Sequence, residues 1–205
     1  MDYSKNASQE TVAKTIAALN KNNFHAEAVA GKDAALARVK ELIPAGAEVM
    51  AGSSTTLDQI GFTDLLKSGD HPWKNLKAPI MAEKDPAVQA KLRKQSVFSQ
   101  YWLGSVHAVT EDGRAVTASA SGSQLPAYAF TSPNLIWVVG TQKIVPTLEE
   151  ALKRIHEYTF PLEDTRMKSV GAPGSNLAKI LIQNNEPAYA KRNITLIFVN
   201  EKLGF

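Results

Sequence analysis

The sequence contains no cysteine among its 205 residues. This absence excludes disulfide bonds, zinc sites built on cysteine, and iron–sulfur clusters held by this chain alone. A chain without disulfides is typical of the cytoplasm, where we expect this protein to be. The four histidines do not have the spacing of metal ligands, so we expect no metal site.

Long apolar runs are also absent. No segment approaches the roughly 20 residues that a membrane-spanning helix needs, and residues 1–10 lack the apolar core of a signal peptide. The net charge is only +3 and the basic residues are scattered, which argues against a nucleic-acid partner.

Several catalytic motifs are missing as well. The chain has no His-Glu-x-x-His, no Gly-x-Ser-x-Gly, no phosphate-binding Gly-x-x-x-x-Gly-Lys and no Gly-x-Gly-x-x-Gly. Zinc enzymes, serine hydrolases, ATPases and standard dinucleotide dehydrogenases are therefore disfavoured.

What is present is typical of a folded α/β protein. Apolar residues make up 44% of the chain and charged residues 21%, enough apolar side chains for a full core. Strand-length apolar segments alternate with amphipathic helical segments, which predicts an open, mainly parallel sheet flanked by helices. We treat residues 1–205 as a single domain, with an N-terminal helical and strand extension (1–46), a core (47–160) and C-terminal strands (161–205).

The pair Asp112-Gly113 lies between two alternating segments, 107–110 and 114–117, and predicts a β-hairpin. This hairpin and the strands of the C-terminal segment are expected to add antiparallel pieces to the sheet.

The most distinctive segment joins a short apolar strand, Val49–Ala51, to Gly52. Four hydroxyl residues follow the glycine: Ser53, Ser54, Thr55 and Thr56. Amide groups at a helix start are unpaired and carry partial positive charge, so we expect an anion to bind here. A capping role is also open, because Thr55 with Asp58 resembles a capping box, but one cap needs only one hydroxyl.

The same pattern recurs at three strand ends, Gly52-Ser53, Gly104-Ser105 and Gly140-Thr141. Ligands of open α/β sheets bind beyond the carboxyl ends of the strands, so these ends could meet around one crevice. The alternative is that glycine and a hydroxyl residue simply end a strand well.

Three further features are candidates. Gly122, Ser123 and Gln124 form a second small polar loop, which a simple helix entry would also explain. Lys143 follows the most apolar strand and could neutralise an anionic ligand, although a surface lysine is the commoner outcome. Glu111 at the hairpin tip could act as base or nucleophile, or be an inert solvated turn residue.

Four segments, taken together and in this order, resemble the lactate-utilisation (LUD) domain family, in particular its LutC/YkgG-like group. They are residues 52–61 (GSSTTLDQIG), 108–113 (AVTEDG), 138–145 (VVGTQKIV) and 148–155 (LEEALKRI). The resemblance implies a fold related to ribose-phosphate isomerases, sugar-phosphate deaminases and CoA transferases (the NagB/RpiA/CoA transferase-like group). It also implies a link to oxidation of lactate or similar hydroxy acids alongside iron–sulfur or other oxidoreductase partner subunits. The Glu111-Asp112-Gly113 run is similar to the Glu-x-Gly that carries the catalytic glutamate of CoA transferases.

The chain departs from the family pattern in two places. Many relatives have Gly-Asn-Arg where this chain has Gly122-Ser123-Gln124, and loss of the arginine removes a bidentate anion clamp. The C-terminal segment lacks the cysteines that some relatives carry, so this chain cannot hold a cluster itself.

Two hypotheses of function follow. In the first, the protein binds a small anionic metabolite or a phosphate-bearing cofactor at Gly52–Thr56. In the second, it is a non-catalytic assembly or regulatory subunit of an iron–sulfur lactate-oxidising complex. The sequence does not decide whether the protein is an enzyme, which cofactor it uses, or whether it forms a homo-oligomer.

Overall fold

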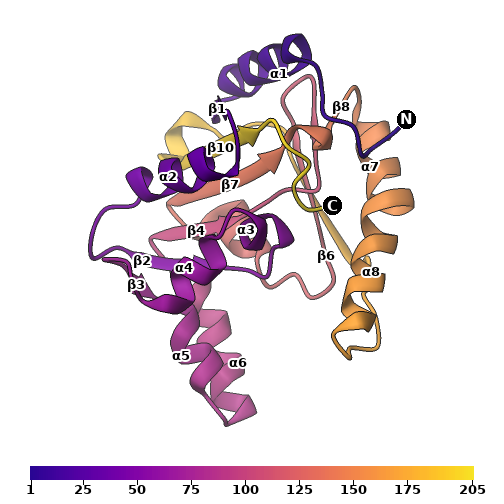
Figure 1. Cartoon of the computed structure of the whole chain (residues 1–205). Coiled ribbons are helices and arrows are strands. Elements are labelled where there is room, and N and C mark those ends of the chain that lie inside the picture. The colour runs from indigo at the N-terminus through magenta and orange to yellow at the C-terminus, as the bar shows by residue number, and fades with distance from the viewer.

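The computed structural model describes residues 1–205 and contains two β-sheets with helices around them (Figure 1). The larger sheet is entirely parallel, with strand order β1-β10-β7-β4-β2-β3. Its strands are β1 (His25–Val29), β2 (Glu48–Ala51), β3 (Lys74–Asn75), β4 (Tyr101–Gly104), β7 (Asn134–Gly140) and β10 (Asn193–Val199).

The second sheet has the order β8-β5-β6-β9. Its strands are β5 (Ala108–Thr110), β6 (Ala115–Ser119), β8 (Ile144–Val145) and β9 (Lys179–Gln183). Strands β5 and β6 form the predicted hairpin, and β9 pairs antiparallel with β6. The predicted fold class, a mainly parallel sheet with helices and antiparallel additions, is therefore confirmed.

One strand differs from the expectation. Strand β10 does not add an antiparallel piece but runs parallel between β1 and β7, inside the larger sheet. Its residues 196–199 are completely buried, which is the normal state of a central parallel strand covered on both faces.

Eight α-helices surround the sheets. They are α1 (Gln9–Lys21), α2 (Lys32–Leu42), α3 (Thr55–Gln59), α4 (Phe62–Ser68), α5 (Lys77–Ala82), α6 (Pro86–Gln95), α7 (Leu148–Arg154) and α8 (Phe160–Ser169). Five short 3₁₀ or π turns complete the chain: η1 (Ser96–Phe98), η2 (Ala127–Thr131), η3 (Thr141–Lys143), η4 (Ile155–Thr159) and η5 (Ala188–Ala190). The side chain of Asp85 caps α6 by accepting from the amide of Ala87, and Pro86 fits the first turn because it needs no amide partner.

Both faces of the larger sheet are buried, as strand β7 shows. Leu135, Trp137 and Val139 pack in a core cluster shared with α1 and α5, whereas Ile136 and Val138 pack in a second cluster shared with α2, α3 and α4. This alternation along one continuous apolar run is why the strand is hydrophobic at every position. A third, smaller cluster joins the second sheet to α7.

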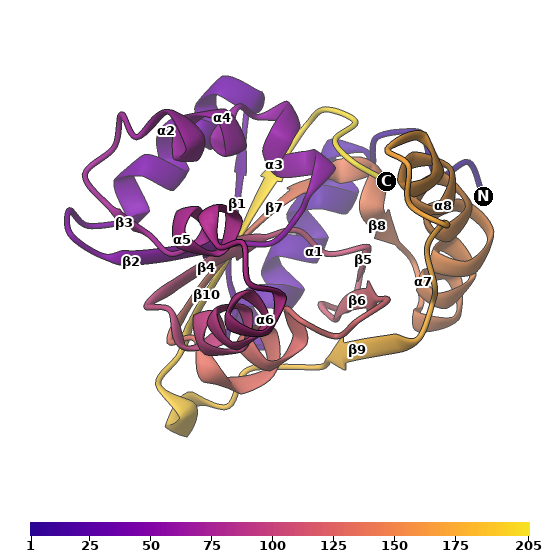
Figure 2. The same ribbon diagram turned by 90° about the horizontal axis from the view of Figure 1, so that it is seen from below.

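Both terminal segments of the chain contribute strands to the sheets. Strand β1, in the segment 1–46, pairs with β10 and forms one edge of the larger sheet. Helix α8 lies in the segment expected to contain strands, and none of its residues is buried, so it leaves no apolar periodicity in the sequence. Figure 2 shows α7 and α8 beside the second sheet, on the opposite side of the molecule from β2 and β3.

Candidate functional site

A cavity of about 490 Å³ lies beyond the carboxyl ends of β2 and β4. Residues of the second sheet, of α8 and of the chain after β10 close its other sides, and the indole of Trp102 on β4 is part of its lining. In an open parallel sheet this edge is where ligands bind, because the loops that follow the strands converge there. We call it the carboxyl-end cavity.

The structure brings most of the predicted site residues together around this cavity. Its lining includes Gly52, Ser53, Ser54, Thr55, Thr56, Gly104, Ser123, Gln124 and Lys143. Gly122, Gly140 and Glu111 are not part of the lining.

Gly140 is excluded from the cavity because the chain after β10 covers it. A Cβ atom at this position would lie 2.7 Å from the backbone of both Glu201 and Leu203. Two of the three strand ends, those at Gly52 and Gly104, therefore meet at the cavity, and the third packs against protein.

Gly122 has a structural task of its own. Its φ of +82° is a conformation that glycine adopts without strain. A Cβ atom there would lie 2.7 Å from the side chain of Lys179 on β9. Gly122 thus lets the loop pass close to β9 and sets the turn that carries Ser123 and Gln124 to the cavity.

The start of α3 is built differently from the expected capping box. Ser54, not Thr55, is the N-cap, and its Oγ accepts from the amide of Leu57 at 3.4 Å. Helix α3 has only five residues, too few for a large macrodipole. The charge at this site therefore comes from side chains and not from the helix.

Lys143 places its amine at the centre of the site. Its side chain is buried, and its Nζ donates to three oxygens, Thr56 Oγ1 at 3.2 Å, Ser105 Oγ at 3.1 Å and the carbonyl oxygen of Val106 at 3.2 Å. All three acceptors are neutral, and no carboxylate lies within ion-pair distance. Burial, with a smaller contribution from the charge of Arg154, holds the pKa of Lys143 well below its usual value.

Further cations line the cavity that the sequence did not single out. Lys77 on α5 and Arg93 on α6 have no carboxylate partner, and Lys77 Nζ donates only to the carbonyl of Gly52, at 3.4 Å. The one acidic side chain of the lining, Glu163 on α8, is bound by Arg166 of the same helix at 2.7 Å. The cavity therefore has an excess of positive charge.

Beneath the cavity lies a second buried cation. Arg154 is completely buried, donates to the carbonyl of His107 and to Thr159 Oγ1, and lies over the ring of Tyr158 at 5.2 Å. Burial, then Lys143 and Arg154, lower the pKa of His107 to about 3, so its ring is neutral at pH 7. The ring is held by its Nδ1, which accepts from the amide of Ala118 at 3.0 Å.

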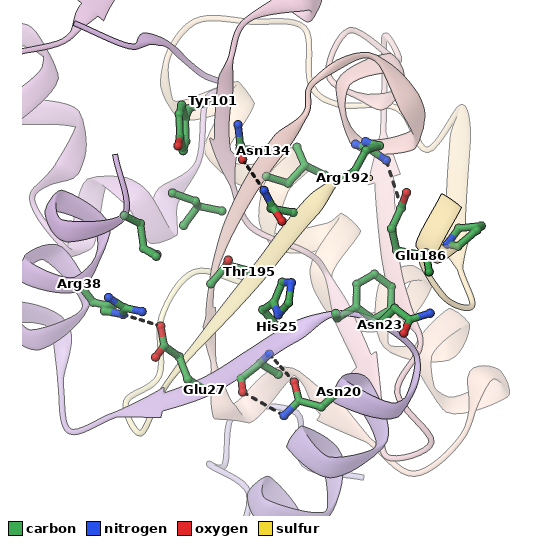
Figure 3. Close-up of a pocket in the computed structure, with 18 residues that line it drawn as sticks. Asn20, Asn23, His25, Glu27, Arg38, Tyr101, Asn134, Glu186, Arg192 and Thr195 are labelled. Carbon is green, nitrogen blue, oxygen red and sulfur yellow. Dashed lines mark hydrogen bonds and ion pairs between the residues drawn. The ribbon is translucent and has the colours of Figure 1, made fainter. Parts of the chain in front are cut away.

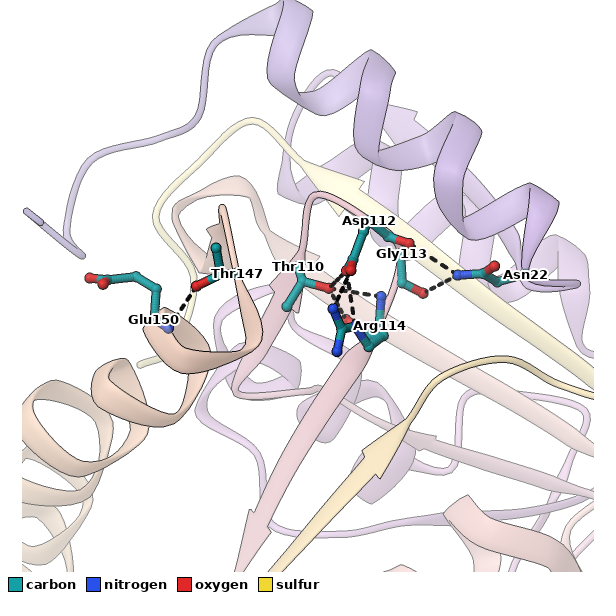
Figure 4. A network of polar contacts seen from close by, with 7 residues as sticks. All are labelled: Asn22, Thr110, Asp112, Gly113, Arg114, Thr147 and Glu150. Carbon is teal, nitrogen blue, oxygen red and sulfur yellow. Dashed lines mark hydrogen bonds and ion pairs between the residues drawn. The ribbon is translucent and has the colours of Figure 1, made fainter.

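The hairpin tip packs against the C-terminal end of α1, where Figure 4 shows Asn22 facing Asp112 and Gly113. The carboxylate of Glu111 accepts from Lys14 Nζ at 2.8 Å. The side chain of Asn22 donates to the carbonyls of Asp112 and Gly113 at 3.1 and 3.0 Å. These contacts give the tip a packing role, and the catalytic role of Glu111 stays a prediction without a cavity contact.

A larger hollow, of about 830 Å³, lies at the opposite edge of the same sheet, where β1, β4, β7 and β10 begin (Figure 3). Its charged side chains bind one another: Arg38 pairs with Glu27 at 2.8 Å and Arg192 with Glu186 at 3.2 Å. No charge there is left for a ligand, so we take the smaller carboxyl-end cavity as the candidate site.

Among the helices, none combines the length and the apolar character that crossing a membrane requires. No three side chains of the metal-binding types come close enough to hold an ion.

These features define an α/β protein with a cavity lined by basic side chains at the carboxyl edge of its parallel sheet. The family model of the LUD domain matches residues 12–199, and the chain therefore belongs to the LUD-domain family, which is associated with lactate utilisation. A crystal structure of a DUF162 family protein from Deinococcus radiodurans is similar to this chain, with a TM-score of 0.55 and 12% sequence identity. The similarity covers 93% of this chain and 97% of that one, and at this identity it supports the fold alone. A search of curated proteins finds no match.

Proposed function

We propose that this LUD-domain protein binds a small anionic metabolite or a phosphate-bearing cofactor in the carboxyl-end cavity, in the utilisation of lactate or a related hydroxy acid. One observation carries the proposal: the amine of Lys143 is buried at the cavity without a carboxylate partner. A buried amine in that state costs the folded protein free energy, and a bound carboxylate or phosphate would offset the cost.

The rest of the lining supports the same class of ligand. Lys77 and Arg93 add unpaired positive charge, which would attract an anion from solution. The hydroxyls of Ser53 and Thr55 offer hydrogen bonds that suit a hydroxyl or carboxylate oxygen. Gly52 leaves open space beside its strand end for a small molecule, whereas at Gly104 the missing side chain makes room for the ring and hydroxyl of Tyr128.

The finer assignments belong to this proposal too. We place the chain in the LutC/YkgG-like group and relate its fold to the ribose-phosphate isomerases and CoA transferases, on the motifs of residues 52–61 and 138–145. In this proposal Gly122 and Gly140 shape the backbone around the site and do not touch the ligand.

Isothermal titration calorimetry tests the proposal, with L-lactate, ribose 5-phosphate and acetyl-CoA as probes. We expect at least one of these anions to bind the wild type and to lose affinity in Lys143→Met and in Ser53→Ala/Thr55→Ala. Equal binding by the wild type and both variants would show that the ligand does not bind in the carboxyl-end cavity. If none of the probes binds, the proposed ligand class is contradicted.

A second function, a non-catalytic subunit, is favoured by one observation. The only acidic side chain in the lining, Glu163, is bound by Arg166, so no unpaired carboxylate side chain is there to act as a general base. In this case the protein would bind its ligand and associate with iron–sulfur or other oxidoreductase subunits. Co-purification with such partners would support this function, and turnover of a hydroxy acid by the isolated protein would contradict it.

A further inference from the structure

The amine of Lys143 has the setting of a nucleophile as well as that of an anion site. We propose that Lys143 forms a Schiff base with a 2-oxo acid, the carbonyl counterpart of a hydroxy acid, in the carboxyl-end cavity. This inference rests on the proposed function because it uses the same cavity and the same class of small anion.

The hydrogen-bond partners of Lys143 Nζ suit an uncharged amine. Two of the three, Thr56 Oγ1 and Ser105 Oγ, are hydroxyls, which can donate as well as accept. They can therefore serve an uncharged amine, whose lone pair needs a donor, as readily as an ammonium group. A carboxylate partner would have held the lysine in its charged, unreactive form, and none is present.

The surroundings of Lys143 favour the uncharged form of its amine. Burial and the nearby guanidinium of Arg154 both disfavour the ammonium form of Lys143. An amine whose pKa is lowered in this way has its lone pair available near neutral pH, which is how enzymes activate lysine toward carbonyl groups.

The cavity contains other basic side chains that can bind the carboxylate of a 2-oxo acid. Lys77 and Arg93 are free to bind the carboxylate of a 2-oxo acid, so Lys143 need not neutralise it. Gly204 lies close to the amine, where a Cβ atom would come within 3.1 Å of Nζ and closer still to Thr56 Oγ1, so glycine at this position leaves both groups undisturbed.

The reaction balances without any oxidant or reductant. The lone pair of Nζ attacks the keto carbon, and one of the two protons of the nitrogen passes to the carbonyl oxygen, which becomes the hydroxyl of a carbinolamine. Loss of this hydroxyl together with the remaining proton of the nitrogen, as one water molecule, leaves a carbon–nitrogen double bond. The net change is amine plus 2-oxo acid to imine plus water.

Borohydride trapping of the full-length protein tests the inference, with pyruvate as the probe. Hydride converts the imine into a stable secondary amine, which adds the mass of pyruvic acid less one oxygen atom. We expect this adduct on the wild type, and we expect peptide mapping to place it on Lys143. L-lactate has no carbonyl group and should give no adduct under the same conditions.

Two variants serve as controls. Lys143→Arg should lose the adduct, whereas Lys67→Arg, which changes an exposed lysine of α4, should keep it. The mapping on wild type does not depend on whether Lys143→Arg folds, so the inference stays testable in either case.

The outcomes separate this inference from the function on which it rests. Calorimetric binding of pyruvate without a trapped adduct would overturn the Schiff base and leave anion binding standing. Equal labelling of Lys143 and the exposed lysines would also overturn it, as non-specific chemistry. Absence of both binding and adduct would overturn the two proposals together.

Discussion

The two edges of the larger sheet each bury a cation, and they treat it in opposite ways. One is the edge where β1, β4, β7 and β10 begin, and we call the larger hollow there the amino-end hollow. In it, Arg192 pairs with Glu186 at 3.2 Å and donates to the backbone carbonyls of Ser132, Ala127 and Tyr128. At the carboxyl-end cavity, Lys143 has neutral partners alone. A buried basic side chain with its own carboxylate holds the fold together, whereas one without a carboxylate is available to a ligand.

The largest expected effect is on the amino-end pair. Arg192→Met should lower the free energy of unfolding by about 3–5 kcal/mol, because it leaves Glu186 buried without its partner. Chemical denaturation measures this change, and calorimetry should show ligand binding unchanged. The double variant Arg192→Met/Glu186→Gln should recover part of the loss, and an undiminished loss would show that the ion pair is not its source.

The next effect concerns His107, between the cavity and Arg154. Its folded pKa of about 3 lies below its ordinary value of 6.5, so between these values the unfolded chain binds a proton that the folded chain does not. Wild-type stability should therefore fall as the pH falls from about 6.5 toward 3, by up to about 1.4 kcal/mol per pH unit.

His107→Asn should remove this part of the acid sensitivity while its side-chain oxygen still accepts from the amide of Ala118. Denaturation curves at several pH values compare the slopes, with the exposed His25→Asn as the matched control. Identical slopes for wild type and His107→Asn would show that the ring is protonated in the folded state.

A smaller change in the free energy of unfolding, opposite in sign to that of Arg192→Met, is expected when Lys143 is replaced. Lys143→Met should raise the free energy of unfolding by about 0.5–2 kcal/mol, because it removes an uncompensated buried amine from a functional site. The same substitution should abolish anion binding, measured by calorimetry. A stable variant that no longer binds the ligand would show that Lys143 serves binding and that Arg192 serves stability. A destabilised variant would mean that the amine of Lys143 contributes to the fold as Arg192 does.

The smallest effect is expected at the hairpin tip. Glu111→Gln removes a solvent-exposed pair with Lys14, and such pairs contribute little to stability. Thermal unfolding and ligand affinity should both match the wild type. A large loss of turnover, in any assay that reports activity, would restore Glu111 as a catalytic residue.

Much of the fold could be predicted because its signals are local. The apolar runs of β2, β4 and β7, the Asp-Gly hairpin and the Asp85 cap of α6 each depend on a few neighbouring residues. The position of β10 could not be predicted in this way, because its neighbours β1 and β7 are distant in sequence and its apolar run suits several places in a sheet.

The residues of the candidate site also fall into those that the sequence predicts and those that it does not. The residues at the ends of β2 and β4 follow their strands directly, so the sequence predicts their place at the cavity. Lys77 and Arg93 come from helices without a motif, and only the tertiary structure brings them there. Gly140 shows the reverse error, since nothing near it in sequence reveals that residues 201–203 cover its strand end.

The position of Trp102 has a practical consequence. Trp102 belongs both to the hydrophobic core and to the lining of the carboxyl-end cavity, whereas Trp137 lies in the core without lining the cavity and Trp73 packs against Phe62. Because indole emission responds to nearby charge and to the loss of contacting water, the protein carries an intrinsic optical sensor of its own cavity. A fluorescence titration, compared with Trp102→Phe, can therefore screen candidate metabolites without label or coupled assay.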